Sequence, residues 1–279
     1  MPHNTGRETT TMLVTSGKGG VGTSMIAALT ALTAAESGKR VLLVDACESG
    51  GTLHHLFGVR PTHSLWMLSH PRIMPRDALV TVDETLMLLP GGTSGAAVAP
   101  TSDDDRRAAL GRVSTIYSDF DLVLFDGGSR LDTITAISDL ADPAVLLVTS
   151  ADRLALAANY ALVKSVRMRR SNAAISVVAN RHGETLSAEA CEYLVDACAH
   201  FLGRAITIAG SIPDDPCLQA AVGAGMTVRD ALAGSPAANA MRAVLAVVLP
   251  SWPRVAIPMP VSAPPSSSSP SPSLSRRWS

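Results

Sequence analysis

The stretch that decides the fold is residues 17–24, which read Gly-Lys-Gly-Gly-Val-Gly-Thr-Ser. Spaced glycines let backbone N–H groups close around phosphate oxygens, and a hydroxyl at the end of such a loop can hold magnesium. Gly17, Gly22 and Ser24 fit the phosphate-loop pattern, but Thr23 stands where that pattern requires a lysine. The loop therefore predicts a phosphate site whose chemistry is altered.

The residues on either side of the loop support a phosphate site over the alternative, a tight turn without a ligand. The apolar run Met12-Leu13-Val14 predicts a buried strand, and the alanine-rich segment Ser24–Ser37 predicts a helix that ends at Gly38. The loop then lies at the N-terminus of a helix, where backbone N–H groups and the helix dipole favour anions.

Lys18, one residue after the first glycine, gives the loop the form of the deviant Walker motif, and the chain resembles the MinD/ParA ATPases. Similar motifs follow in the same order: Lys39–Asp45 resembles the second strand, Phe120–Asp126 the Walker B strand, Val177–Arg181 the base-recognition strand end and Gly210–Pro216 the late Pro-Asp loop. The resemblance covers about Met12 to Leu249. Thr149–Asp152, Ser211–Pro216 and Leu218–Val222 look most like the FlhG/FleN branch, which regulates flagellar number and placement.

Short apolar strands alternate with helical segments, which is typical of an α/β fold with a mostly parallel sheet covered by helices on both faces. The MinD/ParA resemblance implies the same three-layer fold. Further strands are expected near Val41–Val44, Thr85–Leu89, Leu122–Phe125, Ala144–Thr149, Ile175–Ala179 and Ile206–Ala209, and further helices near Arg106–Ser118, Arg153–Arg170, Ala188–Leu202 and Ala237–Leu249. We predict a flexible segment 1–11, one nucleotide-binding domain 12–250 and a disordered tail 251–279 rich in Pro and Ser.

The composition of the 279-residue chain is typical of a soluble α/β protein, with 47% apolar residues, 4% aromatic residues and a net charge of −1. No stretch approaches the roughly 20 uncharged apolar residues that span a bilayer. Residues 1–11 lack the apolar core of a secretory signal, and no amphipathic membrane-targeting helix is evident, so we expect a cytoplasmic protein. The near-neutral chain also gives little support for nucleic-acid binding.

The resemblance implies a site for ATP or ADP with Mg²⁺. Its phosphate-binding residues would be Gly17, Lys18, Gly19, Gly20, Val21, Gly22, Thr23 and Ser24, its base-binding residues Asn180, Arg181, Pro213 and Asp214, and its metal-binding residues Ser24, Asp126 through water and Asp45 in a second shell. Simpler interpretations remain open, because Lys18 could be a solvated lysine, Asp126 a strand-end residue, and Asn180-Arg181 an ordinary turn.

Two substitutions weaken the expected hydrolysis. Thr23 has no charge to offer the β- and γ-phosphates, which costs about 10- to 100-fold in affinity and commonly about 100- to 1000-fold in catalysis. Members of the family end the second strand with Asp-x-Asp, but residues 45–47 read Asp-Ala-Cys, so Cys47 replaces the carboxylate that orients the attacking water. Glu48 is a weak candidate to replace it, and Lys18 and Asp45 are the remaining candidates for catalytic roles.

These features predict an FlhG-like nucleotide-binding regulator of cellular positioning or assembly with weak or absent ATP hydrolysis, a pseudo-ATPase. An active slow ATPase stimulated by a partner and a scaffold that binds no nucleotide are the alternatives. The family resemblance implies a nucleotide-dependent homodimer, in which Lys18 reaches the nucleotide of the partner subunit, and a protein partner that the sequence does not identify.

Overall fold

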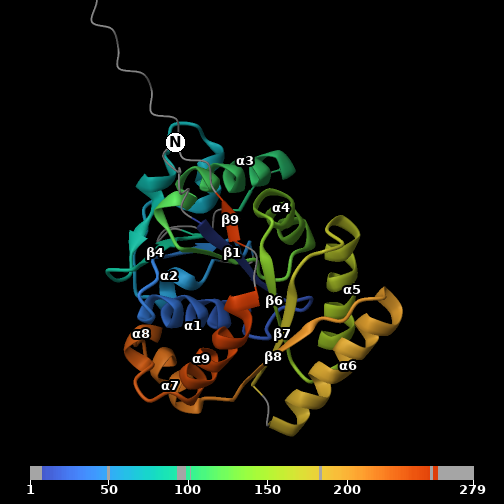
Figure 1. Cartoon of the computed structure of the whole chain (residues 1–279). Helices are drawn as coiled ribbons and strands as arrows, with labels where there is room; N and C mark the ends of the chain where they lie inside the picture. The colour runs from blue at the N-terminus through green and yellow to red at the C-terminus, as the bar shows by residue number, and fades with distance from the viewer. Residues whose placement is uncertain are drawn as a thin grey trace, which may run out of the picture.

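The structure, a computed structural model, describes residues 8–48, 51–92, 99–100, 102–181, 184–251 and 254–256. Its strands form a single sheet that runs through the middle of the molecule (Figure 1). The strands are β1 Glu8–Thr15, β2 Val41–Asp45, β3 Val80–Thr81, β4 Leu86–Leu89, β5 Leu122–Asp126, β6 Ala144–Thr149, β7 Ile175–Asn180, β8 Thr207–Ile212 and β9 Arg254–Ala256. Their order is β3-β4-β2-β5-β1-β6-β7-β8, with β9 paired to β1.

All pairs along this order are parallel except β3 with β4, and β9 is antiparallel to β1. Strand β1 lies between β5 and β6, so the loop that follows it leaves from the centre of the sheet. In the register, Asp45 is paired with Asp126 and Val14 also pairs with Asp126. The sheet therefore brings the ends of β1, β2 and β5 together, at the edge where ligands of α/β proteins bind.

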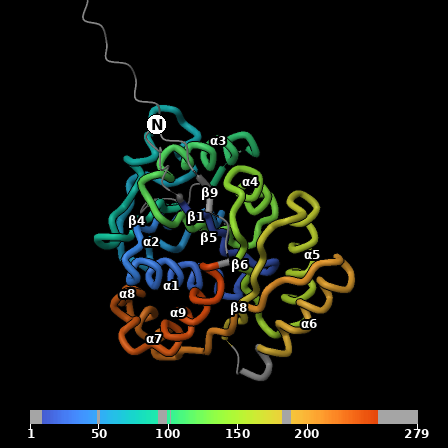
Figure 2. Tube along the Cα trace, viewed as in Figure 1, coloured from blue at the N-terminus to red at the C-terminus, as the bar shows by residue number. Residues whose placement is uncertain are grey.

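The helices form a layer on each face of the sheet, as the tube view in Figure 2 also shows. They are α1 Thr23–Glu36, α2 Leu53–Leu56, α3 Asp103–Val113, α4 Leu131–Ala141, α5 Arg153–Arg169, α6 Glu184–Leu202, α7 Pro216–Gly223, α8 Val228–Ala231 and α9 Pro236–Val248. Short 3₁₀ helices occupy Leu65–Ser69, Pro75–Ala78, Ser114–Asp119 and Leu249–Ser251.

Alternate residues of the strands build two separate cores. Met12 and Val14 pack with α1, α2, α7, α8 and α9 on one face, whereas Leu13 packs with α3, α4, α5 and α6 on the other. Because both faces are covered, the central strands are apolar on both sides, and β2, β5 and β6 are buried along their whole length. The predicted α/β fold with three layers and a mostly parallel sheet is confirmed.

The first strand starts earlier than predicted. It begins at Glu8, so the last four residues of the predicted flexible segment 1–11 belong to the sheet. Thr9 and Thr11 are buried there because their hydroxyls donate to backbone carbonyls, Thr9 to Tyr117 and Phe120 and Thr11 to Ala141. Because these hydroxyls are hydrogen-bonded, the threonines at the start of β1 can be buried. A search for apolar runs in the sequence does not detect such a strand.

The end of the domain also differs from the prediction. Arg254–Ala256, which fall in the predicted disordered tail 251–279, form β9 against residues 8–10 of β1. Strand β6 pairs with β1 only from Met12 onward, which leaves the first residues of β1 open on that side. The remaining residues of the predicted tail, 257–279, lie outside the described residues.

The other predicted elements are present with shifted ends. The helix predicted at Arg106–Ser118 is α3, which begins at Asp103 and continues into a 3₁₀ helix, and the strand predicted at Ile206–Ala209 extends to Ile212 in β8. Ser102 caps α3, because its hydroxyl accepts a hydrogen bond from the N–H of Asp105 at 3.1 Å. The strand β3 and the helices α2, α4, α7 and α8 were not predicted from the sequence.

Candidate functional site

The glycine-rich loop connects β1 to α1 and turns at two glycines. Gly20 and Gly22 have positive φ angles of 82° and 91°, a conformation that residues with a Cβ rarely adopt. Gly22 is the N-cap of α1, so the loop presents the first N–H groups of a 14-residue helix. This is the anion-binding geometry that the sequence predicted.

Thr23, at the position of the missing lysine, faces the base of the loop. Its side chain is buried, and its Oγ1 lies 2.9 Å from Oγ of Ser16. The Ser16 hydroxyl donates its proton to the carbonyl of Lys18 at 2.8 Å, so the proton between the two hydroxyls comes from Thr23. Thr23 thus ties the end of the loop to its start and adds no positive charge.

Ser24 and Asp126, the predicted magnesium-binding residues, lie together. Burial raises the pKa of Asp126, and the nearby Ser24 hydroxyl and the N–H of Gly128, which donates to Oδ1 at 3.1 Å, act against that rise. Oδ2 of Asp126 is buried with no hydrogen-bond partner among the described residues. A buried carboxylate oxygen without a donor fits a cation or its bound water.

Asp45 lies beside Asp126 at the end of the neighbouring strand. Its carboxylate accepts the N–H groups of Cys47 at 3.2 Å and Leu53 at 3.1 Å. Burial and then the charge of Asp126 raise the pKa of Asp45 to about 7. A divalent cation would relieve the repulsion between the two carboxylates, so the residues present fit magnesium.

Gly91, which the sequence analysis did not select, closes over Asp45. A Cβ at Gly91 would lie 2.6 Å from the carbonyl oxygen of Asp45 and 3.0 Å from its carboxylate. A larger residue therefore cannot occupy this position without moving the carboxylate. No pattern in the sequence marked this role, because residues 90–92 read as an ordinary turn after a strand.

Cys47 lies where the sequence placed it, against the loop that follows β5. A Cβ on Gly128 would approach Sγ of Cys47 to 2.9 Å, and Gly128 itself has a φ of 56°. The thiol therefore stands at the site, next to the segment after Asp126, at the position where the sequence resemblance implies a carboxylate. A thiol has no carboxylate oxygen with which to accept a proton from an attacking water.

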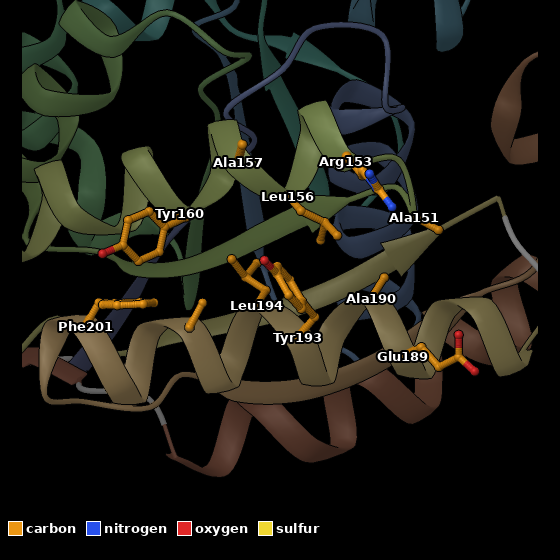
Figure 3. Close-up of a pocket in the computed structure, with 11 residues that line it drawn as sticks. Ala151, Arg153, Leu156, Ala157, Tyr160, Glu189, Ala190, Tyr193, Leu194 and Phe201 are labelled. Carbon is orange, nitrogen blue, oxygen red and sulfur yellow. The ribbon is translucent and has the colours of Figure 1, made fainter.

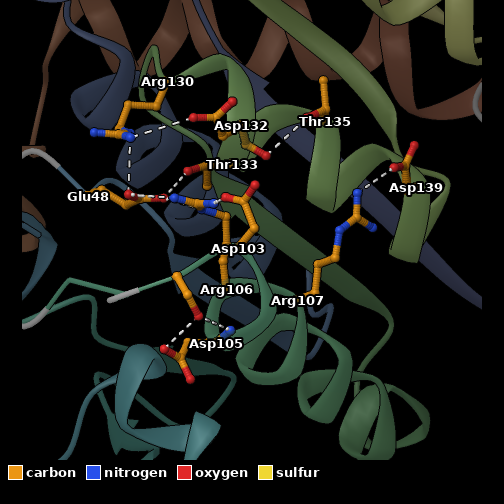
Figure 4. A network of polar contacts seen from close by, with 11 residues as sticks. Glu48, Asp103, Asp105, Arg106, Arg107, Arg130, Asp132, Thr133, Thr135 and Asp139 are labelled. Carbon is orange, nitrogen blue, oxygen red and sulfur yellow. Dashed lines mark hydrogen bonds and ion pairs between the residues drawn. The ribbon is translucent and has the colours of Figure 1, made fainter.

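Glu48 is held away from a catalytic role by a buried network of charges (Figure 4). Its carboxylate accepts hydrogen bonds from Arg106 at 2.7 Å and from the hydroxyl of Thr133, and it forms an ion pair with Arg130 at 3.3 Å. Burial alone would raise the pKa of Glu48, but these partners outweigh it and hold the pKa below its usual value. Glu48 is thus fully engaged with α3 and α4, and Arg106 also pairs with Asp103.

Lys18 points toward α5 of its own chain. Its Nζ donates to Oδ1 of Asp152 at 3.0 Å, and both side chains are partly exposed. The Ser150 hydroxyl, the N–H of Ala155 and Lys18 together hold the pKa of Asp152 well below its usual range. Asp152 is also the N-cap of α5, so Lys18 is coupled to the start of that helix.

Asn159 fixes the start of the loop, and the sequence analysis missed it. Its Oδ1 accepts the N–H of Gly17 at 2.6 Å, and its Nδ2 donates to the carbonyl of Val148 at 3.1 Å. A Cβ at Gly17 would lie 2.3 Å from the backbone of Ala158, so the loop packs directly on α5. The only available signal was one polar residue on the buried side of a predicted helix, which is a common pattern.

The four residues predicted to hold the base come from the ends of β7 and β8. Asn180 is buried and donates to the carbonyl of Val21 at 2.8 Å, which joins it to the phosphate loop. Arg181 has a φ of 65°, and its N–H donates to the carbonyl of Ile212 at 3.0 Å. Asn180, Arg181 and Pro213 line a small cavity beside α1, whereas the carboxylate of Asp214 accepts from Gln219.

The described structure thus brings together the loop, the paired carboxylates and the ends of β7 and β8, which defines a nucleotide-binding domain of the phosphate-loop class. The profile of the CobQ/CobB/MinD/ParA nucleotide binding domain matches residues 12–228. The chain therefore belongs to this family, as its motifs predicted.

Similar proteins refine this assignment. The chain is 28% identical over 250 residues to the antiactivator FleN of Pseudomonas aeruginosa, and the match covers 88% of each chain. It is 26% identical over 151 residues to the flagellum site-determining protein YlxH of Helicobacter pylori, which covers 54% of this chain and 51% of that protein. These matches confirm the resemblance to the FlhG/FleN branch.

Solved structures show the same fold. MinD of Pyrococcus horikoshii, complexed with Mg-ADP, has a TM-score of 0.69 and 21% identity, with 87% of this chain and 97% of that chain covered. A chain of the MinC:MinD cell division complex of Aquifex aeolicus also has a TM-score of 0.69, with 22% identity and coverage of 90% and 98%. Within the described residues of the present chain, no helix is both long and apolar enough to cross a membrane.

Proposed function

We propose that the protein binds ATP or ADP with Mg²⁺ at this site and regulates the positioning or assembly of a cellular structure with weak or absent hydrolysis. The observation that carries the proposal is that one site combines groups suited to binding Mg²⁺ with substitutions of groups expected to act in hydrolysis. Ser24, Asp126 and Asp45 retain a cation-binding arrangement, whereas Thr23 and Cys47 supply neither the cation nor the carboxylate that hydrolysis requires.

Binding is supported by groups that do not depend on the missing lysine. The loop N–H groups at the start of α1 would hold phosphate oxygens, and Ser24 with Asp126 would hold Mg²⁺, with Asp45 in a second shell. Asn180, Arg181, Pro213 and Asp214 would flank the base. A magnesium ion would supply charge neutralisation at the phosphates, while the chain itself positions the nucleotide.

Weak hydrolysis is supported by three side chains. The hydroxyl of Thr23 is hydrogen-bonded to Ser16 and is uncharged, Cys47 lacks a carboxylate, and Glu48 is held by Arg106, Arg130 and Thr133. Thr23 and Cys47 thus lack the charge and the carboxylate that the family resemblance assigns to their positions, and Glu48 is already engaged. Loss of one such group commonly costs about 100- to 1000-fold in rate.

The regulatory role is supported by the relatives, whose names describe an antiactivator and a flagellum site-determining protein. We extend this role to the present chain as a nucleotide-dependent adaptor that works through a homodimer and a protein partner. Lys18 is the residue available for the dimer, provided that it exchanges its contact with Asp152 for one with the partner subunit's nucleotide. The cytoplasm is the expected location.

A slow ATPase that a partner stimulates is the second candidate function. The observation in its favour is Lys18, a cation that extends from the loop and keeps a partly exposed side chain. The double variant Thr23→Lys with Cys47→Asp separates the two functions. It creates turnover if the chain is a pseudo-ATPase, and it changes turnover little if Lys18 already supplies the charge.

Calorimetric titration of the purified protein with Mg-ATP and Mg-ADP tests the proposed binding. We expect saturable binding that weakens in Asp126→Asn, with Asp132→Asn, an exposed carboxylate outside the site, as the matched control. Absence of binding by the parent chain would contradict the proposal and leave the nucleotide-free scaffold.

A further inference from the structure

A groove with a volume of about 710 Å³ lies between α5 and α6, and none of the phosphate loop's glycines lines it. Figure 3 shows Tyr160 on α5 opposite Phe201 and Tyr193 on α6, with the apolar side chains Leu156 and Leu194 between them. The rings of Tyr160 and Phe201 meet edge to face with centroids 6.3 Å apart. The groove is therefore open, apolar and lined by aromatic rings.

The two aromatic residues of α6 that line the groove have side chains mostly exposed to solvent. Tyr193 is 67% exposed and Phe201 is 70% exposed, although the neighbouring Leu194 and Cys198 are buried. Exposed aromatic rings along one groove indicate a surface that another segment covers. Grooves of this type commonly receive proline-rich chains, whose extended helix needs little further ordering.

The chain itself contains such a segment directly after β9. Residues 257–265 read Ile-Pro-Met-Pro-Val-Ser-Ala-Pro-Pro. A polyproline helix has three residues per turn, so Pro258, Val261 and Pro264 would share one apolar face. Ile257, Pro260 and Ala263 would form the adjoining face. The segment thus carries two neighbouring apolar faces that suit an aromatic groove.

The dimensions of the groove and of the segment agree. From Glu189 to Phe201 the helix α6 advances by about 18 Å, and six residues of a polyproline helix span about 19 Å. The 23 residues after Ala256 could span about 70 Å when extended, whereas a domain of this size has a radius of gyration of about 18 Å. The segment can therefore reach the whole groove.

The point from which the segment departs is also favourable. Ala256 pairs with Glu8, the first residue of β1. Phe201 lies at the end of α6, which leads directly into the start of β8. Because β1 and β8 run in the same direction, both residues lie toward the amino-terminal edge of the sheet, and the segment enters the groove from its Phe201 end.

Charge favours the same occupant. Glu189, Glu192 and Asp196 are exposed on α6, and none of them forms an ion pair with a described residue. Residues 257–279 contain Arg276 and Arg277 and no acidic residue. One cation, Arg153, lies at the opposite end of the groove, beyond the part that the aromatic rings line (Figure 3).

We propose that the groove between α5 and α6 binds the proline-rich segment 257–279 of the same chain. The apolar faces of residues 257–265 contact Tyr160, Tyr193 and Phe201, and the two arginines approach the acidic side of α6. The linkage within one chain makes the contact intramolecular, so it does not depend on protein concentration.

Photo-crosslinking in the full chain tests this proposal. The photoreactive residue p-benzoylphenylalanine replaces Tyr193, and a second protein carries it at Val247, an exposed site on α9, as the control. After irradiation, digestion and mass spectrometry identify the linked peptides. We expect position 193, but not position 247, to link to peptides from residues 257–279 within a monomer, with a yield that dilution does not change.

Substitutions then test the chemistry of the contact in the protein labelled at position 193. Phe201→Ser should lower the yield by roughly fivefold or more, because it removes an aromatic anchor of the contact. Leu154→Ser changes an exposed apolar residue of α5 that does not line the groove, and it should leave the yield unchanged. Replacing both Arg276 and Arg277 with Glu should lower the yield, and replacing both with Lys should preserve it.

Three results would overturn the proposal. Links to residues 257–279 that appear only between two chains, and that vanish on dilution, would show that a second copy occupies the groove. Links to other parts of a second chain would do the same. No link from position 193 to residues 257–279, in a protein whose control label reacts normally with its surroundings, would show that the segment does not bind there.

Discussion

Thr23→Lys should tighten the binding of Mg-ATP by roughly 10- to 100-fold. Thr23 is buried at the base of the phosphate loop, and its side chain makes one neutral hydrogen bond to Ser16. Removing that bond costs about 1 kcal/mol in protein stability. Ser16 keeps its own bond to the carbonyl of Lys18, so the loop retains one of its two internal contacts.

The gain comes from charge that the present loop lacks. A lysine at position 23 follows Gly22 directly, at the N-terminus of α1, where phosphate oxygens are expected. A hydrogen bond from a charged donor contributes about 1.5–3 kcal/mol, and each 1.4 kcal/mol changes the affinity about tenfold. The expected gain is in the free energy of binding, because the new charge meets its phosphate partner only in the complex. The loss of about 1 kcal/mol is in the free energy of unfolding.

Calorimetric titration of Mg-ATP into the parent chain and into Thr23→Lys measures this change. Thr23→Met is the matched control, since methionine is about as long as lysine and carries no charge. Urea unfolding of the three proteins, monitored by circular dichroism, separates a loss of stability from a change of affinity. Equal affinities for the parent and Thr23→Lys, or an equal gain in Thr23→Met, would refute the reasoning.

Three further variants test the surroundings of the site. Glu48→Ala should lower the free energy of unfolding by roughly 1–3 kcal/mol, because the buried guanidinium of Arg106 then keeps only its ion pair with the exposed Asp103. Asp132→Asn should cost less than about 1 kcal/mol. The pKa of Glu48 is held below its usual value, so this difference should be present above about pH 4.3 and shrink as urea unfolding is repeated at lower pH. Gly17→Ala should lower the free energy of unfolding by about 1–3 kcal/mol, because its Cβ would meet the backbone of α5 at 2.3 Å. Gly111→Ala on helix α3 is the control and should raise that free energy by about 0.5–1 kcal/mol, because nothing lies within 4 Å of its Cβ. Thermal or urea unfolding that gives the two variants the same stability would contradict this. Asn159→Ala should cost about 1–3 kcal/mol in unfolding free energy, since it leaves the N–H of Gly17 unpaired, and a variant as stable as the parent would show that water replaces the amide.

The fold and the residues of the phosphate loop could be predicted because their signals are local. Buried strands such as residues 122–126 are largely apolar runs, and the glycine-rich loop is marked by its glycines together with the predicted strand before it and the predicted helix after it. The strand ends were predicted from motifs that resemble a known family. The sheet register then brought Asp45 and Asp126 together, which the sequence indicated only through that resemblance.

The rest could not be predicted because it depends on contacts between distant segments. Asn159 holds Gly17 across a sequence separation of 142 residues, and Gly91 makes room for Asp45 only after the sheet has formed. The buried threonines of β1 are acceptable only because carbonyls more than a hundred residues away accept their protons. The hydrogen bonds of Glu48 to Arg106 and Thr133 also join distant segments, so the sequence did not reveal that this carboxylate is already engaged.

The central claim is that the site binds nucleotide and hydrolyses it little or not at all. The most direct test is phosphate release measured on protein that calorimetry has shown to be saturated with Mg-ATP. We predict no release above background in the parent chain and measurable release after Thr23→Lys is combined with Cys47→Asp. Sustained release by the parent chain that Asp126→Asn abolishes would contradict the claim and establish a working ATPase.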